Sequence, residues 1–362
     1  MSLTGENKHD IAMAVTYEGD SEIAMGGDMT KWFSHGMDPI YLTYLLNSPY
    51  GITCKQKRAT GNIIVHISNG KLSEIPLPIS PLAEQHRIVS KIEELLPYID
   101  QYDKAYTKLT AWNKKFPEAI RQSILQYAME GKLVEQRPEE GTAKKLLREI
   151  RAEKERLVKE GKIKKTKPLP EISEDEIPFE VPESWMWVRI AEICTDIVDC
   201  PHSTPKYFPQ DTGFAGVDTN CINADGMITG WRYVTQDTYE KRTARLLPKG
   251  NDIVLTREGS IGRAAILPHG KKICLGQRVM LLRSSQFVHT ELLRKFIMSP
   301  MSLSRLTVQQ KGLGAKHINV SDICKLLIPL PPFTDQKRIV TCIEELFSYC
   351  EQLKEAQQDT LI

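Results

Sequence analysis

The sequence contains one long helix pattern twice. The stretch that opens at Glu84, EQHRIVSKIEELLPYIDQY, returns at Asp335 as DQKRIVTCIEELFSYCEQL. Gln85 returns as Gln336, 251 positions later, and the other identical residues keep that spacing. A repeat unit of this length is too long for a solenoid module. It indicates a duplicated domain, each copy followed by its own helix.

Apolar residues recur at alternating steps of four and three in both copies. This spacing is typical of a coiled-coil seam. Because the chain carries two such helices, we expect them to pair as an intramolecular coiled coil; the alternative is that each packs as a core helix against its own domain. The predicted seam consists of Ile88, Ile92, Leu95, Ile99 and Tyr102 in the first copy and Ile339, Ile343, Leu346 and Leu353 in the second.

Length and composition limit the class of protein. The 362 residues are enough for two or three domains, and 41% hydrophobic with 26% charged residues is typical of a globular chain. No apolar run approaches the ~20 residues of a membrane span, and no signal-peptide pattern opens the chain. The eight cysteines are scattered without a C-x-x-C pair, which favours reduced thiols over zinc ligands or disulfides. We therefore expect a cytoplasmic protein with no membrane contact and no metal.

The repeat also predicts the domain boundaries. Residues 1–75 match only the C-terminal part of the later domain, so we expect roughly 70 residues of a whole first domain to be lacking. The first long helix should end at Phe116-Pro117, because the residue before proline resists the α conformation, with a following helix that Gly131 caps. The predicted order is 1–75, partial first domain; 76–137, first long helix region; 138–181, connector; 182–328, complete second domain; 329–362, second, shorter long helix.

The connector and the second domain have different textures. Thr142 to Gly161 predicts a solvated helix with Leu146, Leu147 and Ile150 on its apolar side. Its basic end, around Lys162, Lys164 and Lys165, is either a solvated hinge or a phosphate contact. After Pro182, short β-like stretches at Asn251–Thr256, Ala264–Leu267 and Val279–Arg283 precede a helix at 290–299. The expected class is α+β, with mixed α/β domains joined to long coiled-coil helices.

No motif in the sequence argues for catalysis. There is no G-x-x-x-x-G-K-(S/T), H-E-x-x-H or G-x-S-x-G pattern. Leu330-Pro331-Pro332-Phe333 resembles the (N/D)PP(F/Y) motif of amino-methyltransferases, but leucine cannot accept a hydrogen bond from the target amine. We therefore predict a protein that is not an enzyme and has no cofactor.

A locally basic stretch is the remaining candidate site. Between Lys241 and Arg278 there are nine Lys or Arg residues and only two acids, although the whole chain carries a net charge of only +2. Arginines beside glycines and short polar residues can reach phosphate or guanine, and glutamine can make a two-point contact with adenine. The alternative is an ordinary charged surface. The predicted DNA-binding residues are His202, Ser203, Thr204, Lys206, Asn220, Arg257, Arg263, Gln277, Arg278, Lys311 and Lys316.

Taken together, the architecture resembles the specificity subunit of type I restriction-modification systems. The resemblance rests on the helix opening PLPP-x-x-(E/D)Q-x-R-I-V-x-x-I-E-E-L, which occurs at Pro81–Glu94 and again at Pro332–Glu345. FPEAIRQSILQYAMEGKLVEQ and PESWMWVRI also look like this family, so the resemblance covers essentially the whole chain.

The resemblance implies two target-recognition domains, each reading half of a split double-stranded DNA site. It implies that the coiled coil sets the spacing between the halves and docks the modification (methyltransferase) subunits, with the restriction subunit joining through the complex. The partial first domain departs from the family pattern and could associate with another copy. The alternatives are an inactive truncated cassette, a coiled-coil scaffold that reads no DNA, and a methyltransferase fragment.

Overall fold

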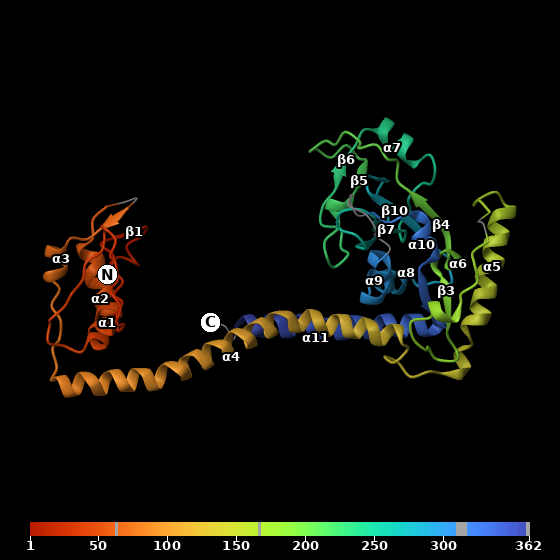
Figure 1. The fold of residues 1–362 in the computed structure, drawn as a ribbon. Coiled ribbons are helices and arrows are strands. Elements are labelled where there is room, and N and C mark those ends of the chain that lie inside the picture. The colour runs from red at the N-terminus through yellow and green to blue at the C-terminus, as the bar shows by residue number, and fades with distance from the viewer. Residues whose placement is uncertain (62–63, 166–167, 309–316, 360–362) are drawn as a thin grey trace. The chain divides into compact units, whose positions relative to one another are not determined.

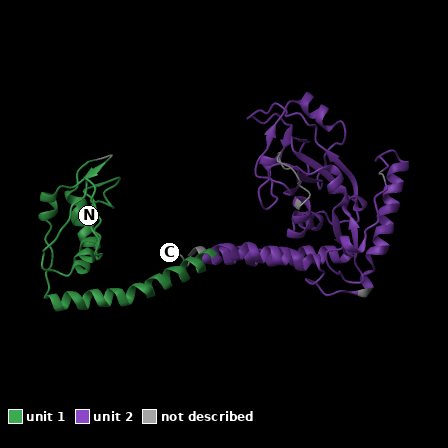
Figure 2. Cartoon of the chain, viewed as in Figure 1, with its two compact units in different colours: residues 1–111 green, residues 112–362 purple. Residues whose placement is uncertain are grey.

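The computed structural model describes residues 1–61, 64–165, 168–308 and 317–359 (Figure 1). Their contacts divide the chain into two compact units, residues 1–111 and 112–362 (Figure 2). Helix α4 (Leu82–Met129) crosses the boundary, so each unit contains part of it. Helices and strands both contribute, which confirms the α+β class. In the described part of the chain, no helix is long and apolar enough to cross a membrane.

The repeat seen in the sequence is also present in the structure. Four helices of the first copy have counterparts in the second, and each counterpart begins 251 residues later. The pairs are α1 (Pro39–Asn47) with α8 (Thr290–Ile297), α2 (Pro49–Arg58) with α9 (Pro300–Val308), α3 (Asn69–Ser73) with α10 (Val320–Lys325), and α4 with α11 (Phe333–Asp359).

Unit 1 contains α1, α2, α3, the first part of α4 and a small two-stranded sheet. Strand β1 (Thr4–Gly5) pairs antiparallel with β2 (Val65–His66). Ile11, Leu46 and Leu72 are among its buried side chains. They divide between two small clusters, with Ile11 and Leu72 in one and Leu46 in the other.

Helix α4 differs from the expected pair of helices. The structure has one continuous helix from Leu82 to Met129, and Pro117 lies buried within it. A proline removes one backbone donor and disfavours the preceding turn, but tertiary packing overrides this preference. Ile124, Ala128 and Met129 of this last section lie in the main hydrophobic core. Gly131 follows the helix with a φ of +70°, as the cap prediction required.

Unit 2 contains a four-stranded antiparallel sheet in the order β4-β10-β7-β8. Its strands are β4 (Cys194–Asp199), β10 (Val279–Ser284), β7 (Ile253–Thr256) and β8 (Ala264–Ile266). A three-stranded sheet, β6-β5-β9, lies beside it. Its strands are β6 (Arg232–Tyr233), β5 (Ala215–Val217) and β9 (Ile273–Leu275), and helix α7 (Gln236–Thr243) follows β6. Strands β3 (Met186–Arg189) and β11 (Leu327–Leu330) form a separate pair, with α6 (Ile190–Ile193) between β3 and β4.

Both faces of the four-stranded sheet are buried. Successive side chains of a strand point to opposite faces. In β7, Ile253 and Leu255 join one core, whereas Val254 joins a second core with β5 and β9. Residues Met280 and Leu281 of β10 divide in the same way. This arrangement explains why the strands appear in the sequence as continuous apolar runs.

The predicted connector helix is confirmed and is part of the core. Helix α5 (Ala143–Lys159) begins after Thr142, whose hydroxyl accepts a hydrogen bond from the Lys145 amide. Its apolar residues Leu146, Leu147 and Ile150 are buried in the main core. The short helices η1 (Pro138–Glu140), η2 (Glu174–Glu176) and η3 (Thr219–Cys221) complete the unit. The first half of α5 is therefore anchored, whatever its basic end contacts.

Candidate nucleic-acid interface

Three loops of the four-stranded sheet meet at one edge because of the strand register. Asp199 at the end of β4 pairs with Met280 at the start of β10, and Val279 pairs with Thr256 at the end of β7. Leu255 in turn pairs with Ala264 at the start of β8. Consequently residues 200–208, 257–263 and 276–278 all leave the sheet at the same edge.

The smaller sheet adds a fourth loop. Strands β5 and β9 are parallel, with Val217 paired to Leu275, so both end together. The Gly276 amide donates to the Val217 carbonyl at 2.6 Å, which holds residues 218–223 beside residues 276–278. We call these four segments, 200–208, 218–223, 257–263 and 276–278, the loop edge. Nine of the predicted DNA-binding residues lie on it; Lys311 and Lys316 fall outside the described residues.

Arg242, which the sequence did not single out, joins two segments of the loop edge. This helix α7 side chain is buried, and its guanidinium donates to four backbone carbonyls. Two belong to the first loop, Pro201 at 3.2 Å and Ser203 at 2.9 Å. The other two lie at the end of β9, Leu275 at 2.6 Å, and just after it, Gly276 at 2.9 Å. The five-donor fork of arginine suits such a task, because one side chain can satisfy carbonyls in several directions.

Gln277 is oriented by the neighbouring loop. Its side-chain oxygen accepts from the Thr204 hydroxyl at 2.5 Å, and its side-chain nitrogen donates to the His202 carbonyl at 3.2 Å. Both contacts are exposed, so the amide lies at the surface with its orientation already set. The adjacent Arg278 has a φ of +66° and a half-exposed side chain, 3.5 Å from Glu258.

Two other predicted arginines are engaged within the protein. Arg257 forms an ion pair with Asp199, and both side chains are largely buried. Arg263 donates to the Ile222 carbonyl at 3.0 Å. As folded, these guanidiniums connect loops to one another. Their contact with DNA stays a prediction.

The remaining predicted residues are more accessible. His202, Ser203, Lys206 and Asn220 are exposed. The Lys206 ammonium lies 5.4 Å from the centre of the Phe208 ring, and His202 lies 3.8 Å from Asp199. Since cations and hydrogen-bonding groups at such positions can reach phosphate or base edges, these side chains are the accessible part of the loop edge.

A buried polar group supports the loop of residues 218–223. Asp218 is 6% exposed, accepts from the Asn220 amide at 2.9 Å and lies 3.3 Å from the Arg232 guanidinium. Arg232 also stacks over the Tyr207 ring at 4.8 Å, and burial raises the pKa of the Tyr207 phenol. The roles of Asp218, Arg232 and Arg242 were not predicted from the sequence, because only the fold brings Arg232 to Asp218 and Arg242 to its carbonyl partners. Of the three, only Arg242 lies in the basic stretch between Lys241 and Arg278.

The predicted seam residues fall in two units. In unit 1, Ile88 and Ile92 are half-buried, while Leu95, Ile99 and Tyr102 are 45%, 59% and 70% exposed. In unit 2, Ile339 and Ile343 are buried in the main core, Leu346 packs at its margin, and Leu353 is 42% exposed. The second helix thus packs partly against its own domain. Pairing along the full predicted seam stays a prediction.

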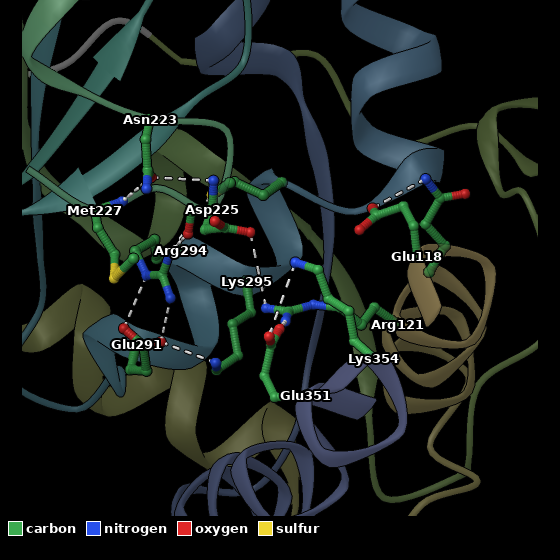
Figure 3. A network of polar contacts seen from close by, with 12 residues as sticks. Glu118, Arg121, Asn223, Asp225, Met227, Glu291, Arg294, Lys295, Glu351 and Lys354 are labelled. Atoms are coloured by element: carbon green, nitrogen blue, oxygen red, sulfur yellow. Dashed lines mark hydrogen bonds and ion pairs between the residues drawn. The ribbon is translucent and has the colours of Figure 1, made fainter. Parts of the chain in front are cut away.

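Within unit 2, the end of α4 and helix α11 are joined to the sheet domain by a polar network (Figure 3). Arg121 of α4 forms an ion pair with Glu351 of α11 and lies 3.9 Å from Asp225 of the sheet domain. The Asp225 carbonyl also accepts from Arg294 of helix α8 at 3.1 Å. This network connects the domain that carries the loop edge to both helices.

The chain is similar in sequence to proteins of one known family. The family model for the type I restriction modification DNA specificity domain matches residues 182–361. The specificity subunits of the type I restriction enzymes EcoEI and EcoAI of Escherichia coli are 27% and 28% identical to this chain, over 88% and 89% of its length. Residues 182–361 belong to the type I restriction modification DNA specificity domain family, and the chain as a whole is similar to type I specificity subunits.

The chain matches only part of the length of these relatives. The chain spans 61% and 62% of the lengths of the two Escherichia coli specificity subunits. The chain is also similar to a solved structure whose subject is complex assembly and conformational transition of the type I R-M system. The TM-score is 0.50 and the identity 20%, and the match covers 90% of this chain and 67% of that one. At that identity the likeness concerns the fold alone.

Proposed function

We propose that this chain is a DNA-reading specificity subunit whose loop edge contacts one half of a split site. The observation that carries the proposal is the convergence of four separate loops at one edge of the two sheets. The buried Arg242 side chain holds two of these loops by hydrogen bonds to their carbonyls. Base reading needs side chains held at a defined position, because hydrogen bonds to base edges depend on geometry. Gln277, held by Thr204 and the His202 carbonyl, meets that requirement.

The division into parts follows the repeat. In this proposal, residues 182–328 are a complete target-recognition domain, residues 1–75 are the C-terminal part of another, and 76–137 and 329–362 are the long helices. Residues 138–181 form the connector. The helices would set the spacing between half-sites and dock modification subunits, with the restriction subunit joining through the complex.

The proposed role is not catalytic. Methylation and cleavage would belong to partner subunits, and the expected compartment is the cytoplasm, where the DNA is. A coiled-coil scaffold without DNA reading is the other candidate, since unit 1 exposes Leu95, Ile99 and Tyr102 along one helix. The two candidates differ in salt-dependent affinity for DNA, which only the first requires.

The proposal is tested by replacing Arg278 with alanine. If the guanidinium contacts a base, its loss should relax the sequence preference at one position and weaken the binding free energy by about 1–3 kcal/mol. If it contacts a phosphate, its loss should reduce the slope of log affinity against log salt concentration by about 1. Fluorescence anisotropy with duplexes from a selected pool, across a salt series, measures both quantities.

A matched control is available on helix α5. Arg156 is also an exposed arginine with one ion pair to a glutamate, Glu160 at 3.9 Å, but it lies away from the loop edge. Arg156→Ala should leave affinity and preference unchanged. Equal effects of the two variants, or none from Arg278→Ala, would contradict the assignment of the loop edge.

A further inference from the structure

The glutamine of the repeated helix opening makes the same contacts in both copies. In unit 2, Gln336 is 1% exposed. Its side-chain oxygen accepts from the backbone amide of His289 at 2.6 Å, and its side-chain nitrogen donates to the carbonyl of Pro331 at 3.2 Å. His289 is the residue before helix α8, and Pro331 lies just before helix α11. One amide group thus joins the start of a domain helix to the start of the long helix.

Unit 1 repeats these two hydrogen bonds, while in unit 2 the Gln336 side-chain nitrogen also lies 3.5 Å from the Phe287 carbonyl. Gln85 is 2% exposed. Its side-chain oxygen accepts from the backbone amide of Asp38 at 2.9 Å, and its side-chain nitrogen donates to the carbonyl of Ser80 at 2.7 Å. Asp38 is the residue before helix α1, the counterpart of α8. All three positions are shifted by 251 residues between the copies.

The partners explain why only the glutamine must be kept. Asp38 corresponds to His289 and Ser80 to Pro331, so the partner residues differ in the two copies. The contacts survive because the partners use backbone groups. An amide side chain has both an acceptor oxygen and a donor nitrogen, and the two backbone groups require one of each. A glutamate would lose the donor and place a carboxylate against a carbonyl oxygen.

We propose that Gln85 and Gln336 are positioning residues that fix the angle between each domain and its long helix. We call each glutamine with its two backbone partners a lock. Each lock lies at the first turn of α4 or α11, so a small rotation there moves the far end of the helix by a large distance. Helix α11 has 27 residues. A change of about 10° at one end of a helix that rises about 1.5 Å per residue moves its far end by roughly 7 Å. For a protein that must hold a reading surface at a defined distance, such a shift is large.

The two locks have different support. In unit 2, helix α8 contributes Glu291, Arg294 and Lys295 to the polar network of Figure 3. The counterparts in α1 are uncharged: Ile40, Thr43 and Tyr44. We therefore expect the angle in unit 1 to depend more on Gln85 than the angle in unit 2 depends on Gln336.

The test measures distances within each unit of the full chain, without DNA, so it does not depend on the proposed reading function. Spin labels are attached through a non-natural amino acid, because the chain has eight cysteines. In unit 1 they replace the exposed Tyr50 and Ile99, and in unit 2 the exposed Leu247 and Tyr349. Pulsed electron paramagnetic resonance gives the width of each distance distribution.

Gln85→Glu and Gln336→Glu should each at least double the width in their own unit, with the larger effect in unit 1. Gln101→Glu and Gln352→Glu are matched controls, since this pair is also 251 residues apart on the same helices but is exposed. They should leave both widths unchanged. Gln85→Met and Gln336→Met, which keep the side-chain length without charge, are measured below their own melting temperatures. Unchanged widths in the folded Glu or Met variants would overturn the proposal.

Discussion

Replacing Arg242 with methionine should loosen the loop edge and destabilise unit 2. Methionine retains much of the aliphatic length but has no donor for the carbonyls of Pro201, Ser203, Leu275 and Gly276. A hydrogen bond from a charged donor contributes about 1.5–3 kcal/mol, and four such bonds are not additive because the buried guanidinium also loses hydration. Part of the loss is recovered when the carbonyls reach water. We expect a net cost of about 3 kcal/mol.

This cost is large enough to measure by melting. For a unit of 150–250 residues, a loss of 1 kcal/mol in the free energy of unfolding lowers the melting temperature by about 2–4 °C, so the melting temperature should fall by roughly 6–12 °C. The melting temperature of Arg242→Lys should lie between those of the natural chain and Arg242→Met, because an ammonium has three donors but lacks the planar fork. Circular dichroism follows the melt, and hydrogen exchange follows the backbone amides of residues 200–204 and 275–278.

The control for this experiment lies three residues along the chain. Arg245 is exposed, so Arg245→Met removes the same charge without the buried contacts. It should change the melting temperature by less than about 2 °C. If Arg242→Met also melted within that range, or if exchange rose elsewhere but not in the two loops, the reasoning about Arg242 would be refuted.

Two further predictions concern ionisable groups in the two units. Burial lowers the pKa of Lys55, which is fully buried with its ammonium 2.9 Å from the Ala12 carbonyl, so its charged form costs stability at neutral pH. Lys55→Met should therefore stabilise unit 1 by about 1 kcal/mol at pH 7, a gain that shrinks as the pH rises towards 10.5 and both states lose the proton; chemical denaturation at several pH values tests this, and a loss of stability at pH 7 would contradict it. Arg189 holds the pKa of Glu176 below its ordinary value of 4.5, so this pair stabilises the fold above that pH and the contribution disappears as the pH falls through the lowered pKa. Glu176→Gln should show a smaller acid-induced fall in melting temperature than the natural chain, and identical acid profiles would exclude the pair as a contributor.

The sequence predicted the repeated architecture because long helices carry their pattern locally. The heptad-like spacing, the prolines before the helix and the shift from Gln85 to Gln336 are all visible without a structure. The continuation of α4 through Pro117 was not predictable in this way. The packing of Ile124 and Met129 into a core formed by distant strands decides it.

The candidate site was predictable as a region but not in its contacts. The basic stretch from Lys241 to Arg278 contributes residues 257–263 and 276–278 to the loop edge, and only the strand register brings these together with residues 200–208 and 218–223. Arg257 meets Asp199 across 58 positions, and Arg242 reaches Pro201 across 41. No local pattern distinguishes an arginine that holds a loop from one that faces a ligand. The structure separates them by burial and by hydrogen-bond partners.

The central claim is that the loop edge reads DNA sequence. Selection of binding sites from a random duplex pool, by the full chain with and without the modification subunit of the same system, tests it most directly. The account predicts an enriched half-site, an affinity that falls steeply with salt, and loss of enrichment at one position in Arg278→Ala. A pool that stays random, with no salt-dependent binding in either case, would contradict it.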